Sequence, residues 1–198
     1  LRQRASKSVK PIAGKASINY MAGIRLGITD QQPDYPAILL AMRILGAPGF
    51  TGRLMQEVRE KEGLTYGTYA SLAGFDGGAD GHVAAWATFA PQLFTKGRAS
   101  VRCEIKKIIE EGASEEEVRK HAELFAAARE VRMNDSGAWA HAAHDTLADN
   151  RPLSYLDEFP EIIKNLSREE INAAIKKYLD LSRMSESAAG PVGKEALK

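Results

Sequence analysis

The chain has 198 residues, of which 44% are hydrophobic and 27% charged, and its 27 Lys and Arg against 26 Asp and Glu give a net charge of +1. This length supports one sizeable hydrophobic core, and a near-neutral charge argues against nucleic-acid binding, which usually needs a basic excess on one face. No apolar run approaches the roughly 20 residues that cross a bilayer. We therefore expect a soluble protein, cytoplasmic or periplasmic, that has no membrane span and does not bind nucleic acid.

The first half of the chain predicts strands and helices separated by glycine and proline. A polar, Lys- and Arg-rich segment over 1–14 is interpreted as a lead-in or linker. Alternating and helical patterns of apolar residues, with Gly46 and Gly63 as helix stops, define the elements that follow. In chain order these are a strand over 17–27, a helix over 35–46, a helix over about 51–62, and strands over 65–73 and 81–89 joined by a glycine-rich hairpin loop.

The second half is mostly helical. A helix over 93–111 contains the single cysteine, Cys103, in a half-apolar context that predicts a small buried hydrophobic residue. Ser114 and Ser167 are each followed three residues later by glutamate, which is the capping-box signature of a helix start. The first box opens a long helix through Glu130 and the second a helix to about residue 179. Residues 184–192 predict a final edge strand.

This order of elements defines the fold class. It lacks the strict strand–helix alternation of a doubly wound parallel sheet. It fits an α+β fold, with a largely antiparallel β-sheet and helices packed on one face. We expect one such domain over 15–192 and a tail over 193–198.

Metal and nucleophile chemistry have weak support in this sequence. His141 and His144 could share a helix face, with Asp145 supporting one of them, but a catalytic zinc site needs a third ligand and a general base. Neither His-x-x-Glu-His nor His-Glu-x-x-His occurs in the chain. Asp76 and Asp80 invite a calcium reading, yet no glutamate follows at the expected spacing. We expect His141 and His144 to pack in a helix or lie on its surface, and Asp76 and Asp80 to belong to a turn.

Arg59 and Tyr66 are the best candidates for function. They flank the predicted turn from the second helix into the first hairpin strand, seven residues apart. Arginine is a permanently charged fork of donors, and tyrosine adds one O–H donor, so together they suit a carbonyl oxygen that gains negative charge. Taken alone, an arginine on a charged helix and a tyrosine in a strand are more often structural.

The neighbourhood of this pair resembles a known family. The segments Ile44-Leu-Gly46, Phe50-Thr-Gly-Arg-Leu54 and Val58-Arg-Glu-Lys-Glu-Gly-Leu-Thr-Tyr66 resemble the second homologous domain of the pitrilysin-type (M16) zinc peptidases. The likeness covers roughly residues 11–180. The family's usual double glycine after Ile-Leu is replaced here by Gly46-Ala-Pro-Gly49.

The resemblance implies a division of labour between two similar α+β halves. In the family, one half carries His-x-x-Glu-His and binds zinc, and the other contributes an arginine and a tyrosine that grip the substrate. By motif position those roles fall on Arg59 and Tyr66. The chain then needs no cofactor of its own, and zinc is expected in a partner domain or subunit that completes a peptidase for unstructured peptides.

Two readings remain open at this stage. In the first, the chain is the substrate-binding half of a zinc metallopeptidase and is inactive alone. In the second, it is a non-catalytic structural member of the family, like the core subunits of the cytochrome bc1 complex. The sequence names neither the substrate nor the missing half.

Overall fold

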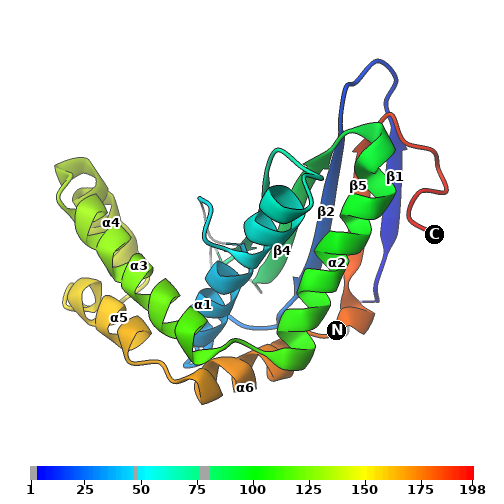
Figure 1. Ribbon diagram of the computed structural model, residues 1–198. Helices are drawn as coiled ribbons and strands as arrows, with labels where there is room; N and C mark the ends of the chain where they lie inside the picture. Colours follow the sequence, from blue (N-terminus) through cyan, green and yellow to red (C-terminus); the bar gives the residue numbers. More distant parts are fainter. Residues whose placement is uncertain (1–3, 47–48, 76–80) are drawn as a thin grey trace.

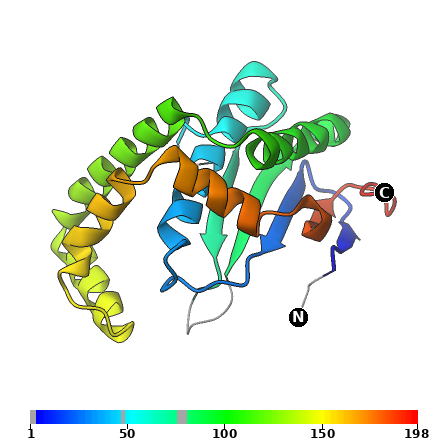
Figure 2. The ribbon, with the colours of Figure 1, turned by 90° about the horizontal axis from the view of Figure 1, so that it is seen from below.

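A five-stranded sheet with helices over one face forms the body of the protein (Figures 1 and 2). The computed structural model describes residues 4–46, 49–75 and 81–198. The strands are β1 (Lys7–Pro11), β2 (Ile18–Arg25), β3 (Thr68–Ala73), β4 (His82–Phe89) and β5 (Ser185–Gly190). The helices are α1 (Tyr35–Gly46), the π-helix η1 (Met55–Lys61), the short 3-10 turns η3 (Pro91–Leu93) and η4 (Leu181–Arg183), α2 (Phe94–Glu111), α3 (Glu115–Met133), α4 (Ser136–Ala148), α5 (Tyr155–Lys164) and α6 (Arg168–Tyr178).

The order of the strands confirms the predicted α+β class and corrects one detail. The order is β1-β5-β2-β4-β3, and every pair is antiparallel except β1 with β5. The prediction of an edge strand near the C-terminus is wrong, because β5 lies inside the sheet between β1 and β2. Residues 7–11 of the expected lead-in form the edge strand β1, and Leu197 in the expected tail is buried.

The two faces of the sheet differ in polarity because side chains alternate along a strand. In β2, Ile18 and Tyr20 are buried beneath the helices, whereas Met21 is 43% exposed on the opposite face. On the buried face, Tyr20 packs against Phe89 and Phe94. Helices α1, α2 and α6 lie over the buried face, and α3, α4 and α5 extend away from the sheet as an arm (Figure 1).

Helix α1 packs closely beneath β3 because it ends in a glycine. A Cβ added to Gly46 would lie 2.2 Å from the amide nitrogen of Ala70 in β3, a distance that real Cβ atoms do not show. Gly46 is therefore both the predicted helix stop and the point at which the helix touches the edge strand.

Both predicted capping boxes are present. The Ser114 and Ser167 hydroxyls accept the N–H of Glu117 and Glu170, and each glutamate side chain accepts the serine N–H in return. These pairs satisfy backbone donors that a helix start leaves free, so they fix the first residues of α3 and α6.

A buried carboxylate holds β5 to the helices. Glu186 has 1% of its side chain exposed, and it pairs with Arg98 at 2.8 Å and with Arg102 at 2.6 Å. The Tyr20 hydroxyl donates to the same carboxylate at 2.7 Å. Burial alone would raise the pKa of Glu186, but the hydrogen bonds from Arg98 and Tyr20 and the two guanidinium charges outweigh it and lower the pKa to about 2.

The prediction that Cys103 is buried is wrong. Its side chain is exposed on α2, where Val101, Ile105 and Ile108 form the buried stripe instead. Glu104 is the buried neighbour, and it accepts a hydrogen bond from Lys107 at 2.6 Å.

Candidate functional site

The turn that joins η1 to β3 carries both candidate residues. The Glu62 N–H donates to the Glu57 carbonyl at 3.0 Å, a five-residue spacing that marks the π-helix. Gly63 has φ +64 and donates to the Arg59 carbonyl at 2.9 Å, and Leu64 then donates back to Val58 at 2.9 Å. Segments of π-helix occur frequently at functional sites because the extra residue per turn re-aims the side chains. The structure makes residues 53–61 helical, within the predicted range of about 51–62, and the π-helical geometry of Met55–Lys61 is visible only in the structure.

Tyr66 stands on a well-anchored support. Leu64 and Thr65 before it are buried, and the Thr65 hydroxyl donates to the Thr88 carbonyl while accepting the N–H of Gly67 at 3.1 Å. The Tyr66 side chain itself is 89% exposed and borders a hollow of about 570 Å³. A rigid turn therefore presents a phenol hydroxyl to whatever approaches this end of the sheet.

Arg59 is held by an aromatic ring instead of a carboxylate. Its guanidinium carbon lies 4.8 Å from the ring centroid of Phe50, which is itself 56% exposed. Within the described residues, no carboxylate pairs with Arg59, whereas its neighbours Arg53 and Lys61 pair with Glu117 and Glu57. Contact with a ring face leaves the five N–H donors of the guanidinium free for a ligand.

The structure places Arg59 and Tyr66 at the two ends of one turn. No hydrogen bond or ring contact joins the two side chains, both of which belong to the described part of the chain. A ligand that uses both donors would therefore lie across the turn.

The other sequence candidates do not form a site. His141 and His144 are exposed on α4, and among the described residues the polar contact of His144 is with Asp145, at 3.1 Å. Across residues 4–46, 49–75 and 81–198, no group of three or more His, Cys, Asp or Glu side chains could hold a metal ion. Asp76 and Asp80 lie outside the described residues.

Arg53, at the start of the second helix, is largely buried and forms an ion pair with α3. It bonds Glu117 through Nε and one terminal nitrogen, at 2.6 and 2.7 Å, and also donates to the Gly112 carbonyl at 2.8 Å. The pair ties the start of the second helix to α3. Burial opposes ionisation of Glu117, but the bonds from Arg53 and Ser114 lower its pKa to about 2.

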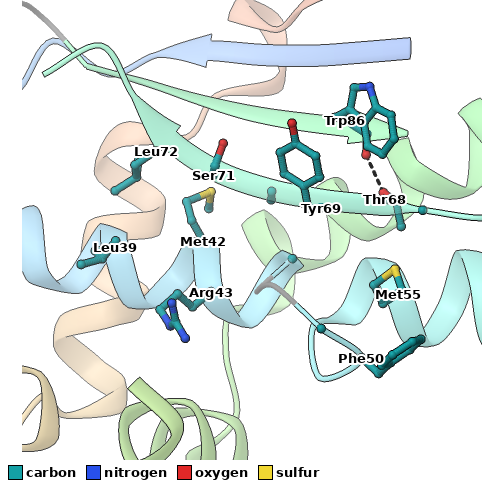
Figure 3. A pocket seen from close by; sticks show the side chains of 14 residues that line it. Leu39, Met42, Arg43, Phe50, Met55, Thr68, Tyr69, Ser71, Leu72 and Trp86 are labelled. Atoms are coloured by element: carbon teal, nitrogen blue, oxygen red, sulfur yellow. Dashed lines mark hydrogen bonds between the residues drawn. The ribbon is translucent and has the colours of Figure 1, made fainter. Parts of the chain in front are cut away.

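A groove that sequence reasoning missed runs beside β3 (Figure 3). We call it the β3 groove. It has a volume of about 580 Å³ and is lined by Leu39, Met42 and Arg43 of α1, by Phe50 and Met55, and by Thr68, Tyr69, Ser71, Leu72 and Trp86 of the sheet. Tyr69 and Trp86 stack across the strands at 5.2 Å. In the sequence, the residues that line this groove form the exposed side of an otherwise apolar helix and strand. That pattern does not predict a cavity.

The fold defines the class of this protein: an α+β domain whose mostly antiparallel five-stranded sheet carries its helices on one face. The family described as Peptidase M16 inactive domain matches residues 4–125, more than half of the chain. The chain belongs to this family, as the resemblance in its sequence predicted.

Individual relatives agree with this assignment. The structure of a peptidase M16 inactive domain from Pseudomonas fluorescens superposes with a TM-score of 0.84 and 29% identity, over 96% of this chain and 44% of that chain. A protease from Helicobacter pylori superposes equally well, with a TM-score of 0.84, at 15% identity over 95% of this chain and 45% of that chain. The periplasmic protease PqqL from Escherichia coli gives 0.75 at 15% identity, over 97% of this chain and 21% of that chain. The last two likenesses show the fold alone.

One curated relative is described as a non-peptidase. The non-peptidase homolog YmxG of Helicobacter pylori is 24% identical over 168 residues, which are 82% of this chain and 37% of the relative. The chain thus spans less than half the length of these relatives. None of the helices in the described part of the chain is long and apolar enough to cross a membrane.

Proposed function

We propose that this chain is the substrate-binding half of a zinc metallopeptidase that acts on unstructured peptides. One observation carries the proposal: a rigid turn has the exposed phenol of Tyr66 at one end and, at the other, Arg59, a guanidinium that no carboxylate in the described residues neutralises. Such donors match the oxygen of a peptide carbonyl as it becomes an oxyanion.

Zinc does not fit the described residues of this chain, which contain no cluster of metal ligands. The proposal therefore assigns the metal to a partner half with His-x-x-Glu-His, either on the same polypeptide or on another subunit. Zinc there would polarise the carbonyl and activate water. The residues of this chain bind and orient the peptide from the opposite side, and we expect the isolated chain to be inactive.

A second candidate function is supported by one specific observation. A relative over 82% of this chain is described as a non-peptidase homolog, which favours a structural role within a larger assembly. In that case the exposed donors would serve no chemistry.

Hydrolysis of an unstructured, internally quenched peptide separates the two functions. We would assay this chain alone, its zinc-bearing partner half alone, and the two mixed with zinc. Activity in the mixture that falls with Tyr66→Phe supports the peptidase reading. A stable complex without hydrolysis would overturn it and favour the structural role.

A further inference from the structure

His121 is a buried histidine that links α3 to the turn before η1, which spans residues 49–52. Only 2% of the residue is exposed. Its ring donates a hydrogen bond to the backbone of Thr51, and its Nδ1 atom is buried without a hydrogen-bond partner among the described residues. A neutral imidazole carries a proton on one nitrogen only, so the bond to Thr51 uses its single donor. A protonated ring would bury a second N–H without an acceptor, which costs free energy.

Two cations near His121 oppose its protonation. Lys120 precedes it in α3, and Arg43 comes from α1, which packs against α3. The guanidinium carbon of Arg43 lies 5.2 Å from the ring centroid of Phe125, which is one turn beyond His121 on the same face of α3. In Figure 3 the Arg43 side chain points away from β3. Burial is the main cause that lowers the pKa of His121, and the charges of Lys120 and Arg43 lower it further.

The carboxylate one turn before His121 is already in use. Glu117 favours the protonated ring through its charge. Its two oxygens, however, accept hydrogen bonds from Arg53 at 2.6 and 2.7 Å, and one of them also accepts the N–H and the hydroxyl of Ser114. The described residues therefore leave a protonated His121 without a carboxylate of its own.

The turn over residues 49–52 and the residue after it are held to α3 by two links that differ in their response to acid. Arg53 is bound to Glu117, whose pKa of about 2 keeps this link intact in mild acid. Thr51 is bound to His121, and a released imidazole takes up a proton below about pH 6.5. Acid therefore weakens the link at Thr51 first, because the released ring gains a proton that the buried ring resists.

We propose that His121 is a positioning residue for Arg59, and that its protonation in mild acid releases the turn that carries Phe50. The neutral ring holds Thr51, and Phe50 beside it places its ring centroid 4.8 Å from the guanidinium carbon of Arg59. Because the pKa of His121 is lowered in the folded state, its contribution to stability is complete above about pH 6.5 and is lost as the pH falls below that value. Only the action of Arg59 on a substrate rests on the proposed function.

Nuclear magnetic resonance of the 198-residue chain tests the inference. The histidine ring resonances are followed from about pH 8 to about pH 5, and that of His121 is assigned by its absence in His121→Gln. The turn is followed in Phe50→Trp labelled with 5-fluorotryptophan, since tryptophan is the best ring partner for a guanidinium. The resonance of residue 50 then joins those of Trp86 and Trp139. Trp139 on α4 reports whether the chain stays folded.

We expect His121 to titrate below pH 6.5 and the resonance of residue 50 to change over the same range, while that of Trp139 stays constant. His121→Gln keeps a side-chain donor for Thr51 but cannot be protonated, so residue 50 should no longer respond to pH. His141→Gln, at an exposed position of α4, is the matched control and should leave the response intact. Arg43→Met removes one opposing cation, so His121 should titrate closer to pH 6.5.

Activity provides a second measurement in the mixture with the zinc-bearing half. The ratio of kcat/KM for His121→Gln to that of the wild type should rise about two- to fivefold as the pH falls from about 7 to about 5.5, because only the wild type loses the contact between Phe50 and Arg59. The ratio cancels the pH dependence of the zinc-bearing half itself.

Several outcomes would overturn the inference. They are a His121 that titrates at or above pH 6.5, a resonance of residue 50 that does not respond to pH, the same response in His121→Gln, or a constant activity ratio despite release of the turn. Release as expected together with an inactive mixture would remove the proposed function alone. Hydrolysis without any release would remove only the inference.

Discussion

The Phe50 ring lies 4.8 Å from the guanidinium carbon of Arg59 and also lines the β3 groove. One aromatic side chain therefore connects Arg59 of the candidate donor pair with the β3 groove.

Tyr66→Phe removes one donor and no packing, because the ring is 89% exposed. In the mixture with the zinc-bearing half, we expect kcat/KM to fall on the order of 10²–10³-fold, as for the loss of an oxyanion donor. Thermal unfolding should not change. Tyr155→Phe on α5 provides the matched control and should leave the rate as it was. A full rate for Tyr66→Phe would remove Tyr66 from the site.

The activity of Phe50 variants should follow the strength of the contact between residue 50 and the Arg59 guanidinium. Exposed cation–π pairs contribute about 0.5–1 kcal/mol, and tryptophan is the best partner. We expect Phe50→Leu to lower kcat/KM about two- to fivefold and Phe50→Trp to preserve it. If Leu and Trp behaved alike, the ring would not position Arg59.

Glu186→Gln should destabilise the fold. The substitution leaves Arg98, whose side chain is 15% exposed, without its carboxylate, and it weakens the bond from Tyr20. Breaking a buried pair in this way costs about 3–5 kcal/mol, measurable as a lower free energy of unfolding in urea. Glu110→Gln, which loses only an exposed pair with Lys106 at 3.7 Å, should cost less than about 1 kcal/mol. Similar values for the two variants would contradict the assigned role of Glu186.

Acid should unfold the protein through the same carboxylates. The pKa of Glu186 and that of Glu117 are both lowered, from 4.5 to about 2, in the folded state. Because the unfolded chain binds these protons first, the stabilisation is complete above about pH 4.5 and is lost as the pH falls towards 2. Urea unfolding between pH 6 and pH 2 should show this loss, with a smaller slope in Glu186→Gln. A free energy of unfolding that stayed constant over this window would show that folding does not lower the pKa of either carboxylate.

Gly46→Ala should disturb the contact between α1 and β3. The new methyl group would meet the backbone at Tyr69 and Ala70, which cannot move aside as a flexible side chain can. We expect the substitution to lower the free energy of unfolding by about 1–3 kcal/mol or more. Gly193→Ala, which has open space around it, is the control for replacing glycine. Wild-type stability in Gly46→Ala would mean that the helix can shift at little cost.

The elements that could be predicted from the sequence are those specified by short-range patterns. Both capping boxes act over three residues, and the helix over 35–46 and the hairpin strands follow from periodic burial and glycine stops. The candidate pair Arg59 and Tyr66 was also found in this way, because one local motif contains both residues. Their roles remain proposals.

What only the tertiary structure decided involves partners far apart in the chain. Arg53 and Glu117 are 64 residues apart, Arg98 and Glu186 are 88 apart, and β5 became an inner strand because Lys7–Pro11 pairs with it. The β3 groove likewise needs α1, η1 and two strands to meet. Periodicity and capping depend on residues a few positions apart in one segment and on whether that segment has an apolar face. The sequence by itself therefore determined the elements and the family likeness. The ion pairs, the strand order and the groove depend on which surfaces meet in three dimensions, and only the packed chain decides that.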